Sequence, residues 1–156
     1  MSDKAEKYRE LLMQAEGLVS GETDPLACMA NVAALVHEAF GFWWTGFYRV
    51  VVGQADGTPG DELLLGPFQG PVACVHIGYG RGVCGTAWKE RRTVVVPDVE
   101  QFPGHIACSA LSRSEIVVPV FSGGEVVAVL DIDSRELNTF DDTDAYWLEK
   151  FAALLA

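Results

Sequence analysis

The sequence predicts an α+β fold in which helices near the two ends of the chain pack on one face of a central antiparallel sheet. Two amphipathic segments come first, a block of strand-like segments joined by glycine-rich turns follows, and another amphipathic segment closes the chain. The chain has 156 residues, of which 49% are hydrophobic and 21% charged, and we expect residues 1–156 to form a single domain with one core.

The first two helices are predicted from periodicity and capping residues. Between Lys4 and Leu18, apolar residues recur at three- and four-residue spacing, which is typical of an amphipathic helix. Asp24 offers an N-cap and Pro25 the first position of a second, largely apolar helix that continues from Leu26 to Phe40. We interpret Cys28 in this helix as a small buried hydrophobic residue.

Two further helices are predicted in the second half of the chain. A glycine-punctuated stretch, Gly78–Gly82, leads into a short helix from Val83 to Glu90. The last helix begins at Asp141 or Asp142, with acidic residues in its first turn, and runs through Leu155.

The strands are predicted from apolar, β-branched and aromatic runs bounded by turn residues. Ser122-Gly123-Gly124 separates the last two runs and indicates a hairpin, and Gly53–Asp61 reads as the tip of an earlier one. The predicted strands are Phe42–Val52, Glu62–Phe68, Val72–Ile77, Thr93–Val96, Glu115–Phe121 and Val126–Ile132.

Charge and composition exclude several classes of partner. Eleven basic and 22 acidic residues give a net charge of −11, which disfavours binding to nucleic acid and to anionic membranes. Residues 1–16 lack the features of a secretory signal, and no apolar run reaches the roughly 20 residues that a bilayer span needs. We therefore expect a soluble, cytoplasmic protein whose four cysteines are available for chemistry.

Three cysteines lie beside glycines or turn-like sequence in the middle of the chain, namely Cys74, Cys84 and Cys108. Their spacing matches no zinc-finger or ribbon pattern, although a zinc site built with His76 or His105 stays open as an alternative. Redox chemistry needs one attacking thiol and one resolving thiol, because a sulfenic acid condenses readily with a second thiol. Burial of all three in the core is the alternative to both.

Three carboxylates are predicted to meet at one edge of the sheet. Asp131 and Asp133 share a face of their strand, and the hairpin brings Glu115 near them. Crowding of this kind raises at least one carboxyl pKa, so that one group could donate a proton while another binds an ammonium group. A solvated acidic strand end is the alternative interpretation.

Aromatic residues surround the start of the first predicted strand. Trp43, Trp44 and Tyr48 belong to the core by their usual preference, although a tryptophan at a pocket rim could enclose a methyl sulfide group.

Six stretches of the chain carry a resemblance to one enzyme group. The chain resembles the free methionine-(R)-sulfoxide reductases, a branch of the GAF-domain family, over nearly its whole length. The stretches are Trp44-Thr-Gly-Phe-Tyr48, Leu65-Gly-Pro-Phe-Gln-Gly-Pro-Val-Ala-Cys74, Gly80-Arg-Gly-Val-Cys84-Gly-Thr, Phe102-Pro-Gly-His-Ile-Ala-Cys108, Ser114-Glu-Ile-Val and Leu130-Asp-Ile-Asp-Ser134.

The resemblance implies a fold, a reaction and a set of roles. It implies a GAF-like antiparallel sheet of about six strands, a homodimer, Cys108 as the attacking thiol, and Cys74 and Cys84 as candidate resolving thiols. The substrate would be free methionine-(R)-sulfoxide and the reductant thioredoxin, with no metal or organic cofactor. The pocket residues implied are Trp44, Tyr48, Glu115, Asp131 and Asp133.

Two segments depart from the family pattern, and one other class of function competes with catalysis. Residues 109–113 are less polar than the family's sequence after its attacking cysteine, and the predicted hairpin tip at residues 53–61 is longer than usual. The competing class is a non-catalytic GAF sensor of a small molecule or of redox state. A sensor of this type usually needs an output domain, for which 156 residues leave no room.

Overall fold

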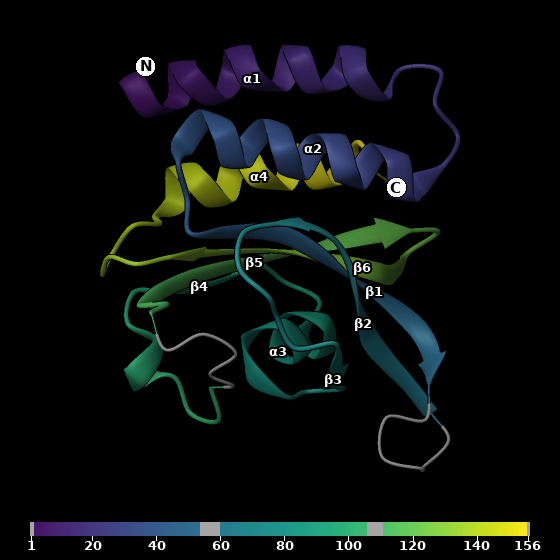
Figure 1. The fold of residues 1–156 in the computed structure, drawn as a ribbon, viewed down its shortest axis with the longest axis vertical. Coiled ribbons are helices and arrows are strands. Elements are labelled where there is room, and N and C mark those ends of the chain that lie inside the picture. Colours follow the sequence, from purple (N-terminus) through teal and green to yellow (C-terminus); the bar gives the residue numbers. More distant parts are fainter. Residues whose placement is uncertain (1, 54–59, 106–110, 156) are drawn as a thin grey trace.

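The computed structural model describes residues 2–53, 60–105 and 111–155. In the described residues, four α-helices accompany a six-stranded antiparallel sheet with the strand order β3-β2-β1-β6-β5-β4 (Figure 1). The predicted α+β class is confirmed. The elements are α1 (Asp3–Val19), α2 (Pro25–Phe40), β1 (Trp44–Gly53), β2 (Gly60–Gln69), β3 (His76–Gly78), α3 (Gly82–Glu90), β4 (Val94–Val96), the 3₁₀ turn η1 (Val99–Gln101), β5 (Ser114–Ser122), β6 (Glu125–Ser134) and α4 (Asp142–Ala153).

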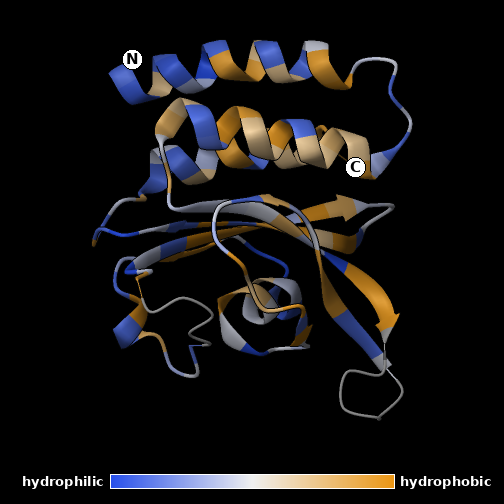
Figure 2. Ribbon diagram, in the orientation of Figure 1, coloured by the Kyte–Doolittle hydropathy of each residue, from blue (hydrophilic) through white to orange (hydrophobic). Residues whose placement is uncertain are grey.

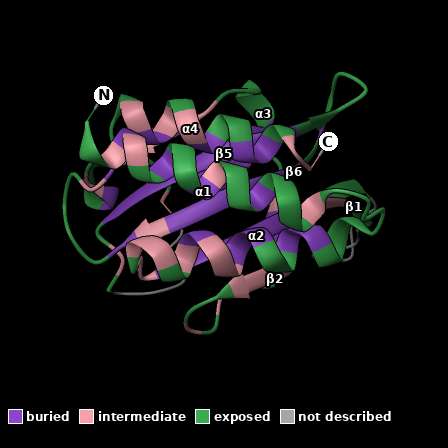
Figure 3. Ribbon diagram, turned by 90° about the horizontal axis from the view of Figure 1, so that it is seen from above, coloured by how far each residue is buried: buried purple, intermediate pink, exposed green. Residues whose placement is uncertain are grey.

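The helices form layers on the two faces of the sheet. Helices α2 and α4 cover one face, and α1 lies over both of them as an outer layer (Figures 1 and 3). Helix α3 and strand β3 cover part of the opposite face (Figure 1). The prediction that the N- and C-terminal helices share one face is confirmed.

Both faces of the sheet are apolar, because residues alternate between two hydrophobic cores along the central strands. In β5 and β6, Ile116 and Leu130 point to the helical layer, whereas Val117 and Val129 point to the side of α3. Figure 2 shows hydrophobic residues concentrated along these strands and along α2. The side chains in register with Val117 and Val129 are therefore held between the sheet and α3.

Capping residues fix the N-terminal ends of α2 and α4, the two helices that cover one face of the sheet. The side chain of Asp24 accepts hydrogen bonds from the backbone N–H groups of Leu26 and Ala27, as predicted for an N-cap. Asp141 and Asp144 form a reciprocal capping box at the start of α4. Helix α4 therefore begins at Asp142, one of the two predicted starts.

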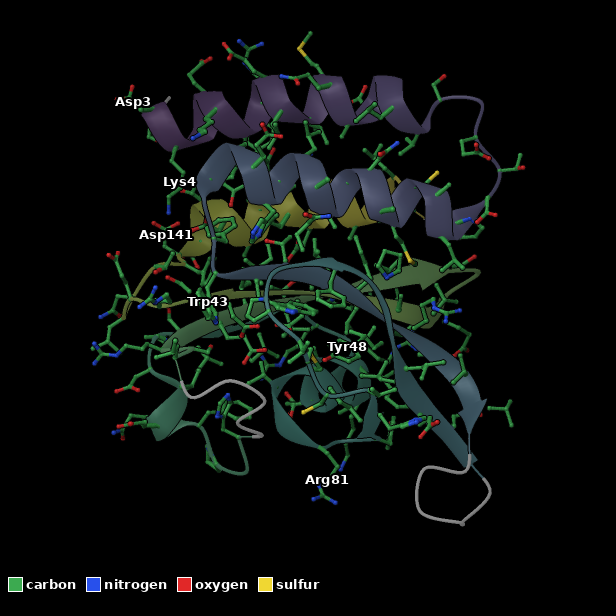
Figure 4. The ribbon with its side chains drawn as sticks, viewed as in Figure 1. Asp3, Lys4, Trp43, Tyr48, Arg81 and Asp141 are labelled. Atoms are coloured by element: carbon green, nitrogen blue, oxygen red, sulfur yellow. The ribbon has the colours of Figure 1, made fainter. Side chains whose placement is uncertain are left out.

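One buried polar contact joins the first helix to the last. The Tyr8 hydroxyl donates to Asp144 Oδ1 at 2.5 Å, and Lys4 Nζ donates to Asp144 Oδ2 at 2.7 Å. Figure 4 shows Lys4 and Asp141 on the same side of the molecule, where their ion pair spans 3.4 Å. Asp144 is 1% exposed, so its carboxylate depends on these partners.

We expect Tyr8→Phe to lower the free energy of unfolding by about 1–3 kcal/mol, because it leaves one oxygen of a buried carboxylate unpaired. The ring would keep its contact with Phe40, whose centroid lies 4.5 Å away. Thermal or denaturant unfolding measures the change. Tyr146→Phe on α4 is the control, since Tyr146 is exposed. Equal stability of the two variants would contradict this role for Asp144.

The third predicted strand is wrong in its bounds. Residues 72–75 are not in the sheet, and β3 contains only His76–Gly78. Two carbonyls of this approach accept hydrogen bonds from side chains of β1: Trp44 Nε1 donates to Pro71 O and Tyr48 Oη to Cys74 O. The bounds of the other predicted strands and helices lie within two residues of the observed bounds.

Three further sequence-based expectations concern membrane spans, Cys28 and the first hairpin tip. In the described part of the chain, no helix is long and apolar enough to cross a membrane. Cys28 is buried and free, as its interpretation as a small core residue predicts. Most of the predicted hairpin tip at residues 53–61 lies outside the described residues.

Candidate active site

A pocket of about 50 Å³ lies between the sheet and α3. Its lining comes from β1, the approach to β3, the start of α3, and the β5–β6 hairpin. Every described residue that the sequence analysis placed at the site lines it except Cys74. The lining residues are Trp43, Trp44, Tyr48, Val72, Ala73, Ile77, Arg81, Gly82, Val83, Cys84, His105, Ser112, Glu115, Asp131 and Asp133.

The β5–β6 hairpin places three carboxylates in this pocket. Glu115 of β5 pairs directly with Asp133 of β6, and two residues along the strands Val117 pairs with Asp131. All three side chains therefore point to the side of α3, as the strand alternation predicts. Glu115 and Asp131 are buried, at 5% and 6% exposure, and Asp133 is half-buried. The predicted convergence of the three carboxylates is confirmed.

The carboxylates disturb one another electrostatically. Burial raises the pKa of Glu115 well above its usual range, and the charge of Asp133 adds to this effect. Burial likewise raises the pKa of Asp131, together with the charge of Glu115, and the pKa of Asp133, together with the charge of Asp131. Because like charges repel one another in a poorly solvated site, this arrangement opposes the simultaneous ionisation of all three groups.

Cys84 lies at the floor of the pocket, in the first turn of α3. Its Sγ, one oxygen of Glu115 and one oxygen of Asp131 all lie within 4.8 Å of one another. Helix α3 reaches this depth because Gly85 lacks a side chain: a Cβ there would lie 2.7 Å from the Gly78 carbonyl oxygen. Burial, followed by the charges of Asp131 and Glu115, raises the pKa of the Cys84 thiol well above its usual range.

The aromatic wall of the pocket comes from alternate residues of β1. Trp44 and Tyr48 are buried, and their rings stack with centroids 5.9 Å apart. The residue between them on this face is Gly46, where a Cβ would lie 2.7 Å from the Trp44 ring. Figure 4 shows Tyr48 on the α3 side of the sheet. The absence of a side chain at Gly46 therefore lets the indole of Trp44 lie against β1.

The two remaining cysteines named by the sequence analysis lie differently. Cys74 is disulfide-bonded, and its carbonyl accepts the Tyr48 hydroxyl at 2.9 Å. Cys108 lies outside the described residues. The described residues His105 and Ser112, on either side of that gap, both line the pocket. Cys28 and Cys84 are the free cysteines of the described chain.

Sequence analysis did not assign three of the polar lining residues to the substrate pocket, although it named His105 as a possible zinc ligand. His105 Nε2 lies 3.7 Å from Glu115 Oε1, and burial lowers the pKa of this histidine. Ser112 Oγ donates to Asp133 Oδ1 at 3.3 Å. Arg81 lines the mouth of the pocket, and Figure 4 shows its guanidinium directed away from the sheet. Their closeness in sequence to Cys84, Cys108 and Glu115 was the only available signal.

His76 does not take part in the pocket. Its Nδ1 contacts Glu62 Oε1 at 2.8 Å, and it is absent from the described lining. A zinc site that uses His76 together with the cysteines therefore finds no support in the described geometry.

Fold and sequence together define the class of protein. Residues 22–156 match the GAF domain family, and the chain belongs to it. The sheet with helices on one face and a pocket beside the short helix α3 on the other is thus the form that the GAF domain takes in this chain.

Within that family, the chain is similar to enzymes that reduce free methionine-R-sulfoxide. Proteins named free methionine-R-sulfoxide reductase from Saccharomyces cerevisiae and Escherichia coli are 42% and 43% identical to it. The alignments cover 98% of this chain and 86% and 88% of those proteins. The chain belongs to the family that contains these oxidoreductases.

A solved structure agrees with this placement. The free methionine-R-sulfoxide reductase from Neisseria meningitidis, solved in complex with its substrate, is 55% identical and superimposes with a TM-score of 0.91. The match covers 99% of this chain and 89% of that one.

Proposed function

We propose that this protein reduces free methionine-(R)-sulfoxide to methionine. The observation that carries the proposal is the pocket in which Glu115, Asp131 and Asp133 face the indole of Trp44. The names of the yeast and E. coli relatives and the substrate complex of the N. meningitidis enzyme support the choice of substrate.

The pocket offers a separate partner for each part of this substrate. An ionised carboxylate binds the α-ammonium group, and a protonated one donates a hydrogen bond to the sulfoxide oxygen. The rings of Trp44 and Tyr48 provide an apolar surface for the methyl sulfide end. Burial of Glu115 and Asp131 between the sheet and α3 favours a small free amino acid over a polypeptide segment as the ligand.

In the proposed reaction, the Cys108 thiolate attacks the sulfoxide sulfur while a carboxyl group protonates the oxygen, and the transient bond between the two sulfur atoms breaks when the hydroxyl moves to the Cys108 sulfur. The oxygen passes to Cys108 as its bond to the substrate sulfur breaks, so methionine leaves and Cys108 becomes a sulfenic acid. A resolving thiol then displaces water and forms a disulfide. Thioredoxin returns both cysteines to thiols by exchange, and the cycle needs no metal or organic cofactor.

Cys74 is the better candidate for the resolving thiol. It is disulfide-bonded, whereas Cys84 is free. The high pKa of the Cys84 thiol, caused by burial and by neighbouring carboxylates, also makes its attacking thiolate form scarce. We therefore assign Cys74 to recycling and place Cys84 in the wall of the substrate pocket.

We expect Cys74→Ser to release one methionine per enzyme at a normal rate and then to stop or slow strongly with thioredoxin. Cys84→Ser should keep thioredoxin-dependent cycling and change the substrate KM, since Cys84 lines the pocket. Rapid-quench measurement of the first turnover and a coupled steady-state assay separate the two steps. If Cys84→Ser alone lost recycling, the two assignments would have to be exchanged.

Selectivity is the direct test of the proposed function. We expect turnover of the free (R)-sulfoxide, and at least about 10-fold lower kcat/KM for the (S)-epimer, since inversion leaves the oxygen and its donor unpaired. The kcat/KM for peptide-bound sulfoxide should be at least as low as that for the (S)-epimer, because the peptide-bound residue lacks the ammonium group. A thioredoxin-coupled assay on the resolved substrates measures both. Comparable efficiency on the peptide would rule out a closed pocket, and binding without turnover would favour a non-catalytic GAF sensor.

Two features of the proposal concern assembly and location. The family resemblance implies a homodimer, which light scattering on purified protein would test. The reaction also needs a reduced thioredoxin pool, which is consistent with a cytoplasmic location.

A further inference from the structure

The pocket contains three metal-ligating side chains drawn from three different elements. Cys84 comes from α3, Glu115 from β5 and Asp131 from β6, and one ligand atom of each lies within 4.8 Å of the other two. All three residues are buried. Among the described residues, no lysine or arginine lies within 4.0 Å of the carboxylates of Glu115, Asp131 or Asp133. In the described chain, the only basic side chain paired with these carboxylates is therefore His105, whose pKa is lowered by burial.

An orphaned polar atom provides an independent indication of a ligand. Asp131 is 6% exposed and lines the pocket, and its Oδ1 is buried without a hydrogen-bond partner in the described structure. A buried carboxylate oxygen without a donor is unfavourable, so a cation placed against it would be stabilised.

The donor set favours one chemical class of cation. Sulfur and oxygen ligands together suit zinc and its spectroscopic substitute cobalt, whereas magnesium and calcium take oxygen ligands alone. His105 Nε2 lies 3.7 Å from Glu115 Oε1 and is a ligand type that zinc prefers, but it is not within 4.8 Å of all three other ligand atoms. Ligand atoms of a tetrahedral zinc ion lie about 3.3–3.8 Å apart, so Cys84, Glu115 and Asp131 would need side-chain shifts of about 1 Å, and the His105 side chain would also have to turn toward them.

We propose that this pocket binds a zinc-class divalent cation through Cys84, Glu115 and Asp131, with His105 as the fourth ligand. The Cys84 thiol loses its proton to solvent when its sulfur binds the metal. Because Glu115 and Asp131 would then hold the metal, a bound cation excludes the amino acid substrate. Inhibition of sulfoxide reduction by the cation rests on the proposed function, whereas binding of the cation to the pocket does not.

The test uses the protein with its Cys74 disulfide intact, after treatment with a chelator and its removal. In this form the free thiols of the described chain are Cys28 and Cys84. Cobalt(II) titration should give one equivalent of binding, a thiolate-to-cobalt charge-transfer band and the strong visible absorption of tetrahedral cobalt. Zinc should displace the cobalt and abolish both signals.

Three variants assign the ligands. Cys84→Ser should lose the charge-transfer band, and Asp131→Asn should weaken zinc binding at least about 10-fold while it keeps the band. Cys28→Ala should change neither, because Cys28 lies in α2 on the other face of the sheet. Circular dichroism confirms that each variant is folded. Absence of stoichiometric cobalt binding by the wild-type protein, or a charge-transfer band that persists in Cys84→Ser, would overturn the proposal.

Activity measurements keep the two hypotheses apart. For the wild-type enzyme, zinc should raise the apparent KM for methionine sulfoxide, and a chelator should reverse the effect. Cobalt binding without any sulfoxide turnover would leave the metal site standing and refute the proposed function. Turnover without cobalt binding would support the proposed function and refute the metal site.

Discussion

Replacing Cys108 with serine should lower sulfoxide turnover by at least about 10³-fold, because a serine hydroxyl is a far weaker nucleophile than a thiolate near neutral pH. The loss should extend to the first turnover, unlike the recycling defect expected of Cys74→Ser. A rapid-quench assay with excess enzyme measures released methionine directly.

Substrate binding separates this chemical defect from unfolding. Cys108→Ser should still bind free methionine-(R)-sulfoxide, because the carboxylates and the aromatic wall come from β1, β5 and β6. Calorimetry would detect that binding. If the variant released methionine at the wild-type rate in its first turnover, another group would have to be the nucleophile, and the assignment by family resemblance would fail.

Amide substitution of the three carboxyl groups should have the second largest effect. Glu115→Gln, Asp131→Asn and Asp133→Asn each remove either a proton donor or a binding charge. Loss of the donor should lower kcat by about 10²–10⁴-fold, whereas loss of the ammonium partner should mainly raise KM. Steady-state kinetics on each variant assigns the roles. Near-normal kinetics for all three variants would show that these carboxyl groups are a solvated strand end without a role in the reaction.

The same substitutions should stabilise the protein at neutral pH. The folded state raises the pKa of Glu115, Asp131 and Asp133, so it retains protons that the unfolded chain releases above about pH 4. Stability therefore falls as pH rises from about 4 toward the folded pKa values, and each amide should reduce that slope. Thermal unfolding at several pH values measures it.

Glu125→Gln provides the matched control for both readouts. This carboxyl lies on the same strand, β6, but its side chain is 82% exposed. It should leave kinetics and the pH dependence of stability unchanged. An equal effect of Glu125→Gln would show that net charge, rather than the crowded pocket, controls stability.

Local signals determined much of this fold. The cap at Asp24 and the three- and four-residue spacing predict the helices because those features act within one turn of the chain. The alternation of β5 and β6 with a glycine turn fixes their register, so Glu115, Asp131 and Asp133 were predictable as neighbours. Strand spacing failed at Val72–Ile77, where side chains from β1 take the carbonyls of Pro71 and Cys74.

The sequence by itself determined the fold class, the hairpin that gathers the carboxylates and the family of the chain. The tertiary structure alone decided that Cys84 meets those carboxylates, because α3 is placed against β3 and the sheet by contacts such as that of Gly85 with the Gly78 carbonyl. That packing buries the Cys84 thiol beside Glu115 and Asp131, and among the described residues it leaves Asp131 Oδ1 without a hydrogen-bond partner. Burial and the distances between charges from separate elements set these properties, and neither is encoded in the spacing of residues along the chain.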